Sequence, residues 1–335
     1  MIKKTGAIVL KIAVTVGFYV IIFLKVDVAQ LLSQLRNTRI SFFVAACFVY
    51  IAIQGLSAYR WYLLLRPLGL GTPYRKLLSY YFLGMFFNQF LPTSIGGDLM
   101  RVYYLNKETR TLSGSTASVF LDRDLGMLAL LIIALAAATI AGTTFNGFLL
   151  APIFAGILVL FIGANLALFY RPTYNLLHKV LALLRMKRAD VRVERLFNSV
   201  NSFRGNGSLI TWTMVLSFMI QFGCTVVNML CAIAIGMTTR NGWLDFLVFI
   251  PATGLISMAP VGVNGMGWRE ASYIVLFQTV ILNSAKPGAQ AFALSVLWLA
   301  VLVLTSLPGG LIYLMQGGKQ KANDGEEAAR MASAF

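Results

Sequence analysis

The chain has 335 residues, of which 58% are apolar and only 12% are charged, and its formal net charge is +16. Soluble domains carry about 25% charged residues, so this composition excludes an ordinary soluble domain and indicates a polytopic membrane protein. In that setting, basic cytoplasmic loops and contact with anionic lipid headgroups explain the positive charge better than nucleic acid does.

Cysteine and histidine are scarce. Cys47, Cys224 and Cys231 all lie in apolar runs, which argues against a disulfide framework or a zinc site. The single histidine, His178, lies in a basic stretch and is expected to be a solvated surface side chain. We expect no metal and no cofactor.

The first elements are predicted to be apolar helices. One runs from about Gly6 to Leu24, and a short polar segment leads to a second over Ile40–Leu65. The second ends in Tyr59-Arg60-Trp61-Tyr62, and aromatic and basic residues together are typical of a membrane–water interface.

A shorter apolar segment, Leu77–Leu91, is interrupted by a proline–glycine break and resumes over Gly97–Leu105. Because 15 residues are short for a membrane span, residues 77–105 are predicted to form a re-entrant hairpin. The next helix, about Ser113–Ala141, carries Asp122-Arg123-Asp124 roughly 15 Å from its start at 1.5 Å per residue.

The remaining elements follow a similar order. A helix over about Gly147–Tyr170 leads into a basic loop, residues 171–207, with a predicted amphipathic helix on the inner leaflet. A helix over Leu209–Ile235, a second re-entrant hairpin over residues 243–282 and a last helix over Gln290–Met315 complete the membrane part. The polar tail, residues 317–335, is predicted to be disordered.

The two breaks are spaced identically. Adding 168 to Pro92, Gly97 and Arg101 gives Pro260, Gly265 and Arg269. This predicts two repeats, residues 1–145 and 146–316, each with about three transmembrane helices and one re-entrant hairpin. An odd number of spans inverts the second repeat, so the predicted fold class is an all-α polytopic membrane protein with an inverted repeat. The hairpin breaks are Pro92, Gly96, Gly97, Pro260, Gly262 and Gly265.

The basic clusters predict the orientation. Placing residues 171–207 in the cytoplasm also places both termini there, in a cell (inner or plasma) membrane. The hairpins then enter from opposite leaflets, and their tips meet near the bilayer centre, where such transporters hold substrate.

Charges at membrane depth are costly, about 2.5–3.5 kcal/mol each on insertion scales, so they mark candidate sites. An arginine at the start of a resumed helix adds a planar fork suited to phosphate. The alternative is structural ion pairs: Arg101 with Asp98 or Asp122, and Arg269 with Glu270 or Asp124. The candidate substrate-binding residues are Arg101, Arg269, Asp98, Asp122, Arg123, Asp124, Glu270 and Asn264.

The stretches FLPTSIGGDLMRVYYL (Phe90–Leu105) and APVGVNGMGWREASYIVLF (Ala259–Phe277) resemble the flippase-like transmembrane domain of lysylphosphatidylglycerol synthases and its stand-alone relatives. The resemblance covers roughly Ile8–Gln316. It implies movement of an aminoacylated phospholipid between leaflets, and stand-alone relatives are linked to polyprenyl- or dolichyl-phosphate sugar pathways and hopanoid export. Synthases carry a soluble aminoacyl-transferase domain after the membrane part, which we do not expect here.

The favoured hypothesis is therefore a lipid transporter, not an enzyme, that moves an anionic or phosphate-containing lipid. Its expected partners are that lipid and anionic inner-leaflet lipids at residues 171–207, with a second copy of the chain or a lipid-modifying enzyme as further candidates. Two alternatives stay open. One is a glycosyl- or aminoacyl-lipid transferase using Asp98, Asp122 or Asp124, and the other is a scaffold subunit of a lipid-modifying complex.

Overall fold

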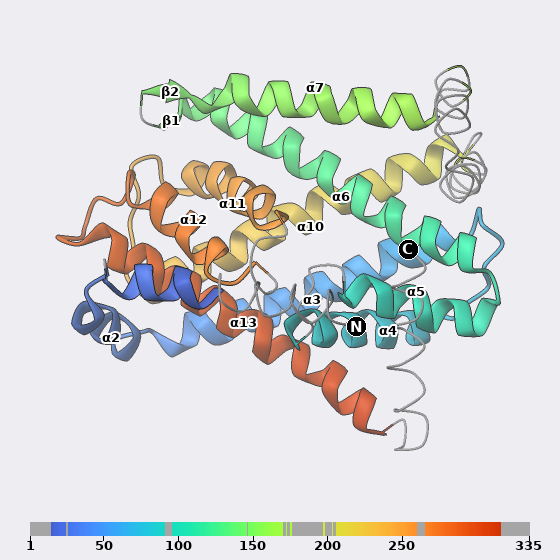
Figure 1. Ribbon diagram of the computed structural model, residues 1–335, viewed down its shortest axis with the longest axis horizontal. Helices are drawn as coiled ribbons and strands as arrows, with labels where there is room; N and C mark the ends of the chain where they lie inside the picture. Colours follow the sequence, from blue (N-terminus) through green and yellow to red (C-terminus); the bar gives the residue numbers. More distant parts are fainter. Residues whose placement is uncertain are drawn as a thin grey trace.

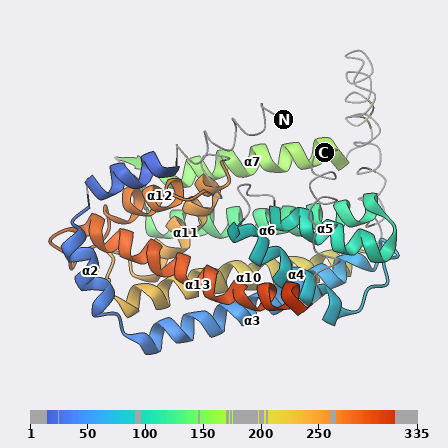
Figure 2. The same cartoon turned by 60° about the horizontal axis from the view of Figure 1, so that its bottom comes forward.

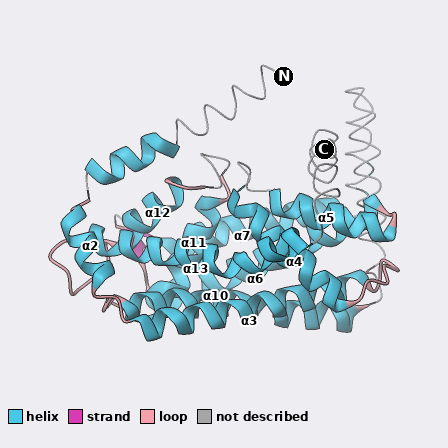
Figure 3. Ribbon diagram, turned by 90° about the horizontal axis from the view of Figure 1, so that it is seen from below, coloured by secondary structure: helices cyan, strands magenta, loops and turns pink. Residues whose placement is uncertain are grey.

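The computed structural model describes residues 15–24, 26–90, 96–145, 147–169, 206–259 and 265–315, together with positions 172, 175, 197 and 203. Nearly all regular structure in these ranges is helical (Figure 3). Four of the helices described are long and apolar enough to cross a membrane, or five if the helical segment Thr15–Leu24 and α2 (Val28–Arg36) form one bent span. The four are α3 (Ile40–Leu65), α6 (Leu112–Ala141), α10 (Gly207–Ala234) and α13 (Pro287–Met315). The all-α polytopic fold class is confirmed.

The polar segment after the first helix forms α2. Asp27 caps it by accepting a hydrogen bond from the Gln30 backbone N–H at 3.0 Å. Leu31 is buried while most other side chains of this helix are exposed or half-buried. The short polar segment noted in the sequence is therefore a short amphipathic helix. Asp27 also forms an ion pair with Lys286, which precedes α13.

α3 and α10 run side by side through the bundle (Figure 3). The bounds of α3 match the predicted helix. The interface position predicted for its last turns stays a prediction, but Arg60 is 5% exposed and Trp61 is fully buried. Their side chains face α6 and α10, because both make hydrogen bonds there.

Each predicted break separates two helices that pack against each other. α4 (Tyr74–Phe90) and α5 (Gly96–Thr109) form the first helical hairpin, and α11 (Trp243–Ser257) and α12 (Trp268–Phe277) form the second. Pro92, Pro260, Gly262 and Asn264 lie outside the described residues. The assignment of the hairpins to two inverted repeats stays a prediction.

The last helix joins the two hairpins. α13 packs against both α4 and α12 (Figure 2). Close approach to α4 is possible because α13 has Gly309 and Gly310 at the contact; a Cβ atom at Gly309 would overlap the Phe82 backbone. A continuous core joins the first half of α13 to α3, α6, α10, α11 and α12.

α7 (Leu150–Phe169) follows α6 after a small β-hairpin of β1 (Thr144–Phe145) and β2 (Phe148–Leu149). α7 packs against α6 at one edge of the bundle (Figure 1). The predicted basic loop lies almost wholly outside the described residues, as does the predicted tail, residues 317–335.

Candidate functional site

A polar cavity of about 290 Å³ lies between the two helical hairpins. The first hairpin contributes α4 and α5, the second contributes the end of α11 and Arg269, and α3, α6 and α13 complete the wall. The lining comprises Tyr50, Gln54, Tyr81, Gly84, Met85, Asn88, Gln89, Gly97, Asp98, Arg101, Arg123, Gly254, Ser257, Met258, Arg269 and Leu302.

Three guanidinium groups and one carboxylate line this cavity. They belong to Arg101, Arg123 and Arg269 on the positive side and to Asp98 on the negative side. Arginine forks bind carboxylate and phosphate through paired N–H donors. The charges of the wall therefore favour an anionic ligand.

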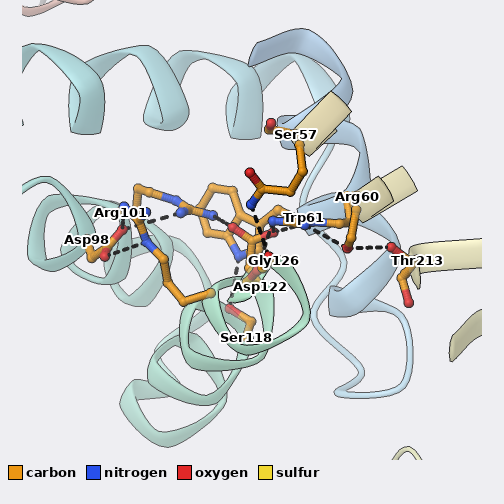
Figure 4. A network of polar contacts seen from close by, with 12 residues as sticks. Ser57, Arg60, Trp61, Asp98, Arg101, Ser118, Asp122, Gly126 and Thr213 are labelled. Carbon is orange, nitrogen blue, oxygen red and sulfur yellow. Dashed lines mark hydrogen bonds and ion pairs between the residues drawn. The ribbon is translucent and has the colours of Figure 1, made fainter. Parts of the chain in front are cut away.

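Asp122 lies behind the wall and holds two arginines in place (Figure 4). It is 1% exposed. Oδ1 accepts a hydrogen bond from Arg60 Nε at 2.9 Å, and Oδ2 accepts one from Arg101 Nη2 at 2.8 Å. Arg60 also donates to Ser217 Oγ at 2.7 Å. This buried carboxylate thereby connects α3, α5, α6 and α10.

Arg101 is further held by two aromatic rings. Its guanidinium carbon lies 4.3 Å from the ring centroid of Trp61 and 4.5 Å from that of Tyr81, both within cation–π range. Trp61 is fixed in turn by a hydrogen bond from Nε1 to Ser118 Oγ at 3.1 Å. The Arg101 fork is therefore preorganised and costs little to order when an anion binds.

Arg123 is the accessible member of the set. Its side chain is 54% exposed, against 4% for Arg101 and 9% for Arg269. It makes a bidentate pair with Asp98, from Nε at 2.8 Å and from Nη2 at 2.9 Å. Asp98 also lies 3.4 Å from Arg101 Nη1, so one carboxylate orients two of the cavity's arginines.

Glycine brings α5 close enough to α4 to form the wall. A Cβ atom at Gly97 would overlap the Gly84 carbonyl oxygen and the Asn88 side chain. The Gly97 backbone N–H instead donates to Asn88 Oδ1 at 2.9 Å, which satisfies a donor in the first turn of α5. The glycines of the first break thus set the distance between the two arms of the hairpin.

Arg269, the arginine that follows the second break, is held by different contacts. Arg269 donates to Glu270 Oε1 from Nε at 3.0 Å and from Nη2 at 2.6 Å. The other oxygen of Glu270 accepts from the Gly267 backbone N–H at 2.6 Å and caps α12. Gly267 has φ +80°, a conformation that L side chains rarely adopt. The cap and the ion pair together fix Arg269 beside the cavity.

The structure brings most of the predicted site residues together. Asp98, Arg101, Arg123 and Arg269 line the cavity, and the buried carboxylates of Asp122 and Glu270 pair with its arginines. The ion pairs of Arg101 with Asp98 and Asp122 and of Arg269 with Glu270 form as considered, and substrate binding by these residues stays a prediction.

Asp124 does not join this group. It lines a separate apolar cavity on the other side of α6, and the pair considered between Asp124 and Arg269 does not form because Arg269 bonds to the adjacent Glu270. Asn264 lies outside the described residues.

Sequence reasoning missed Arg60. An arginine inside the otherwise uncharged run Ile40–Leu65 is a functional-site signal in its own right. The neighbouring tyrosines suggested a membrane–water interface, and Arg60 was therefore assigned to that interface and not to the site. Trp61, Tyr81 and Ser217 carried no signal because their roles arise only from contacts between helices.

The charged groups of the cavity wall are suited to an anion. Among the described residues, no group of three or more His, Cys, Asp or Glu side chains is arranged to hold a metal ion. The guanidinium groups offer paired donors to a doubly or singly charged oxyanion.

A search of curated proteins finds no match. The family described as lysylphosphatidylglycerol synthase TM region matches residues 8–310, nearly the whole membrane part of the chain. This chain belongs to the lysylphosphatidylglycerol synthase transmembrane region family.

Proposed function

We propose that this protein is a lipid transporter that moves an anionic, phosphate-containing lipid between the two leaflets of a cell membrane. The carrying observation is the cavity that both helical hairpins line, with Arg101, Arg123 and Arg269 in its wall. Membership of a lipid-related membrane family supports the lipid as ligand.

The size of the cavity limits which part of a lipid it holds. Pockets for drug-sized ligands measure about 300–1,000 Å³, and this one is about 290 Å³. A phosphate-bearing headgroup is of suitable size, whereas two acyl chains are not. The chains would therefore stay in the bilayer while the headgroup enters between the hairpins.

An inverted repeat would explain how such a headgroup reaches both leaflets. If the hairpins enter from opposite sides, movement of either hairpin opens the cavity to its own leaflet. In this arrangement both termini are cytoplasmic, and the basic residues 171–207 contact anionic lipids of the inner leaflet.

We assign no catalytic step to the protein. Asp98 and Asp122 each pair with two guanidinium groups, so both carboxylates are engaged in holding arginines. A positioning role for both carboxylates is consistent with this geometry.

The test is leaflet exchange in proteoliposomes that contain a fluorescent anionic phospholipid and, separately, its zwitterionic counterpart. Arg123→Gln is the sharpest variant, since its exposed side chain can be removed without opening the buried network. We expect anionic-lipid exchange to fall about tenfold, the loss of one charge-assisted hydrogen bond of about 1.4 kcal/mol.

Arg240→Gln is the matched control, because Arg240 is exposed and does not line the cavity. It should exchange lipid at the wild-type rate. Equal rates in wild type, Arg123→Gln and empty vesicles would refute transport, and equal rates for both lipids would refute selection by charge.

A further inference from the structure

Asp122 and Asp124 lie on the same helix but in opposite environments. Two positions along an α-helix turn the side chain by about 200°. Asp122 therefore points to the arginines behind the central cavity, while Asp124 points to a second cavity of about 380 Å³ between α3, α6, α7 and α10. Anion binding in the central cavity therefore gives Asp124 no role.

The second cavity is apolar. Apart from Asp124, its wall is formed by leucine, isoleucine and phenylalanine side chains with two polar exceptions, Asn165 and Thr213. Thr213 donates to carbonyl groups of its own helix. Asn165 is thus the polar side chain that lines this cavity together with Asp124.

Asp124 forms no ion pair within the described part of the chain. Two arginines on α3 and α6 are engaged elsewhere, Arg60 with Asp122 and Ser217, and Arg123 with Asp98. α7 and α10 contain no charged residue.

The other titratable groups around α6 also face away from this cavity. Cys224 and Cys231 on α10 are absent from its lining. On α11, Asp245 accepts hydrogen bonds from Asn241. On α5, Asp98 and Arg101 line the central cavity instead.

We propose that Asp124 is a proton-binding site, reached through the apolar cavity and separate from the ion-paired arginine network. An ionised carboxylate in apolar surroundings, with no ion-pair partner among the described residues, lacks the solvation that water provides, and the group neutralises by taking up a proton from water. Ionisable residues of this kind mark proton relays in membrane proteins.

Asn165 offers an unpaired acceptor on the wall of this cavity. Its Nδ2 donates to the Phe161 carbonyl at 3.0 Å, which fixes the orientation of the amide. Its Oδ1 is buried and has no hydrogen-bond partner in the described residues. A protonated carboxyl beside it offers the missing O–H donor, whereas an ionised carboxylate can only accept.

Covalent labelling of the purified full-length protein tests the proposal without any transport assay. Dicyclohexylcarbodiimide adds to protonated carboxyl groups in apolar surroundings. Trypsin cleaves after Arg123, so Asp122 and Asp124 fall in different peptides and mass spectrometry separates them. We expect an adduct on the Asp124 peptide at pH 7, falling about tenfold for each pH unit above the titration midpoint, and at least about tenfold less on the Asp122 peptide.

Asp124→Asn is the matched variant, because its amide copies the shape of the neutral acid. It should fold like wild type, lose the adduct and lose an infrared carbonyl band of a protonated carboxyl. No adduct at Asp124 anywhere between pH 5 and 9, equal labelling of Asp122, or an infrared band that survives in Asp124→Asn would each overturn the proposal.

Discussion

Arg60 on α3 and Asp122 on α6 are joined by two hydrogen bonds from one guanidinium group. Arg60 Nε donates to Asp122 Oδ1 at 2.9 Å, and Nη2 donates to the Asp122 backbone carbonyl at 2.8 Å. Both side chains are nearly inaccessible, at 6% and 2% exposure. The pair therefore locks α3 to α6 directly behind the cavity that we assign to the lipid headgroup.

Replacing Arg60 with methionine should destabilise the fold. Removing one partner of a buried ion pair costs about 3–5 kcal/mol because the other charge is left unpaired. Arg101 still bonds to Asp122 Oδ2, so we expect the lower end of that range. The apparent Tm in detergent, followed by tryptophan fluorescence, measures the loss.

Arg60→Lys should fall between wild type and Arg60→Met, since lysine keeps the charge but not the planar fork. Arg66→Met is the control, because Arg66 is exposed one residue beyond the end of α3. A Tm for Arg60→Met equal to that of Arg66→Met would show that the pair contributes nothing.

The close contact of α4 and α5 predicts a second result. Gly97→Ala places a methyl group against the Gly84 carbonyl and the Asn88 side chain, so the hairpin must open. Overpacking of this kind costs about 1–3 kcal/mol. Gly163→Ala in α7 is the matched control, since nothing lies within 4 Å of its Cβ position. There the better helix propensity of alanine should leave Tm unchanged or raised, whereas equal Tm values for both variants would contradict the contact.

The sequence predicts the elements well, since apolar length and proline–glycine breaks act locally. α3 begins at Ile40 and ends at Leu65 as predicted, and the arginines that follow each break line one cavity. Pairing between distant helices leaves no local pattern in the sequence. Arg60 and Asp122 are 62 positions apart, and nothing in either segment states that they meet. For the same reason, the opposite orientations of Asp122 and Asp124 emerge only once the neighbours of α6 are known.

The open end of the first hairpin is tied by Glu108. Its carboxylate accepts from Lys76 Nζ at 2.7 Å and from the Tyr80 hydroxyl at 2.8 Å. Partial burial acts to raise the pKa of Glu108, but these hydrogen bonds outweigh it and hold the pKa below its ordinary value. The stabilisation is then fully present above the unfolded pKa of about 4.3 and is lost as pH falls through the lower folded value.

Tm measured from pH 7 down to pH 3 tests this in wild type and Glu108→Gln. At pH 7 the wild type should have the higher Tm. The difference in stability should be at most about 1 kcal/mol, because the lysine of the pair is exposed. The two curves should converge below about pH 4. A difference in Tm between wild type and Glu108→Gln that persists at pH 3 would show that the charge of Glu108 is not its cause.

α6 carries both Asp122 and Asp124, so protonation of Asp124 is expected to affect lipid transport by way of this helix. An ionised Asp124 opposes movement of α6 through apolar surroundings, whereas the neutral acid does not. Exchange in wild type should therefore slow as pH rises, and Asp124→Asn should keep the low-pH rate at every pH. Proteoliposome exchange of the anionic lipid between pH 5 and 9 measures this, with Glu108→Gln as the control that keeps the wild-type profile. The same pH profile in wild type and Asp124→Asn would separate the proton site from transport. If neither the wild type nor any variant exchanges lipid, the transport function is refuted. Carbodiimide labelling still decides in that case whether Asp124 binds a proton.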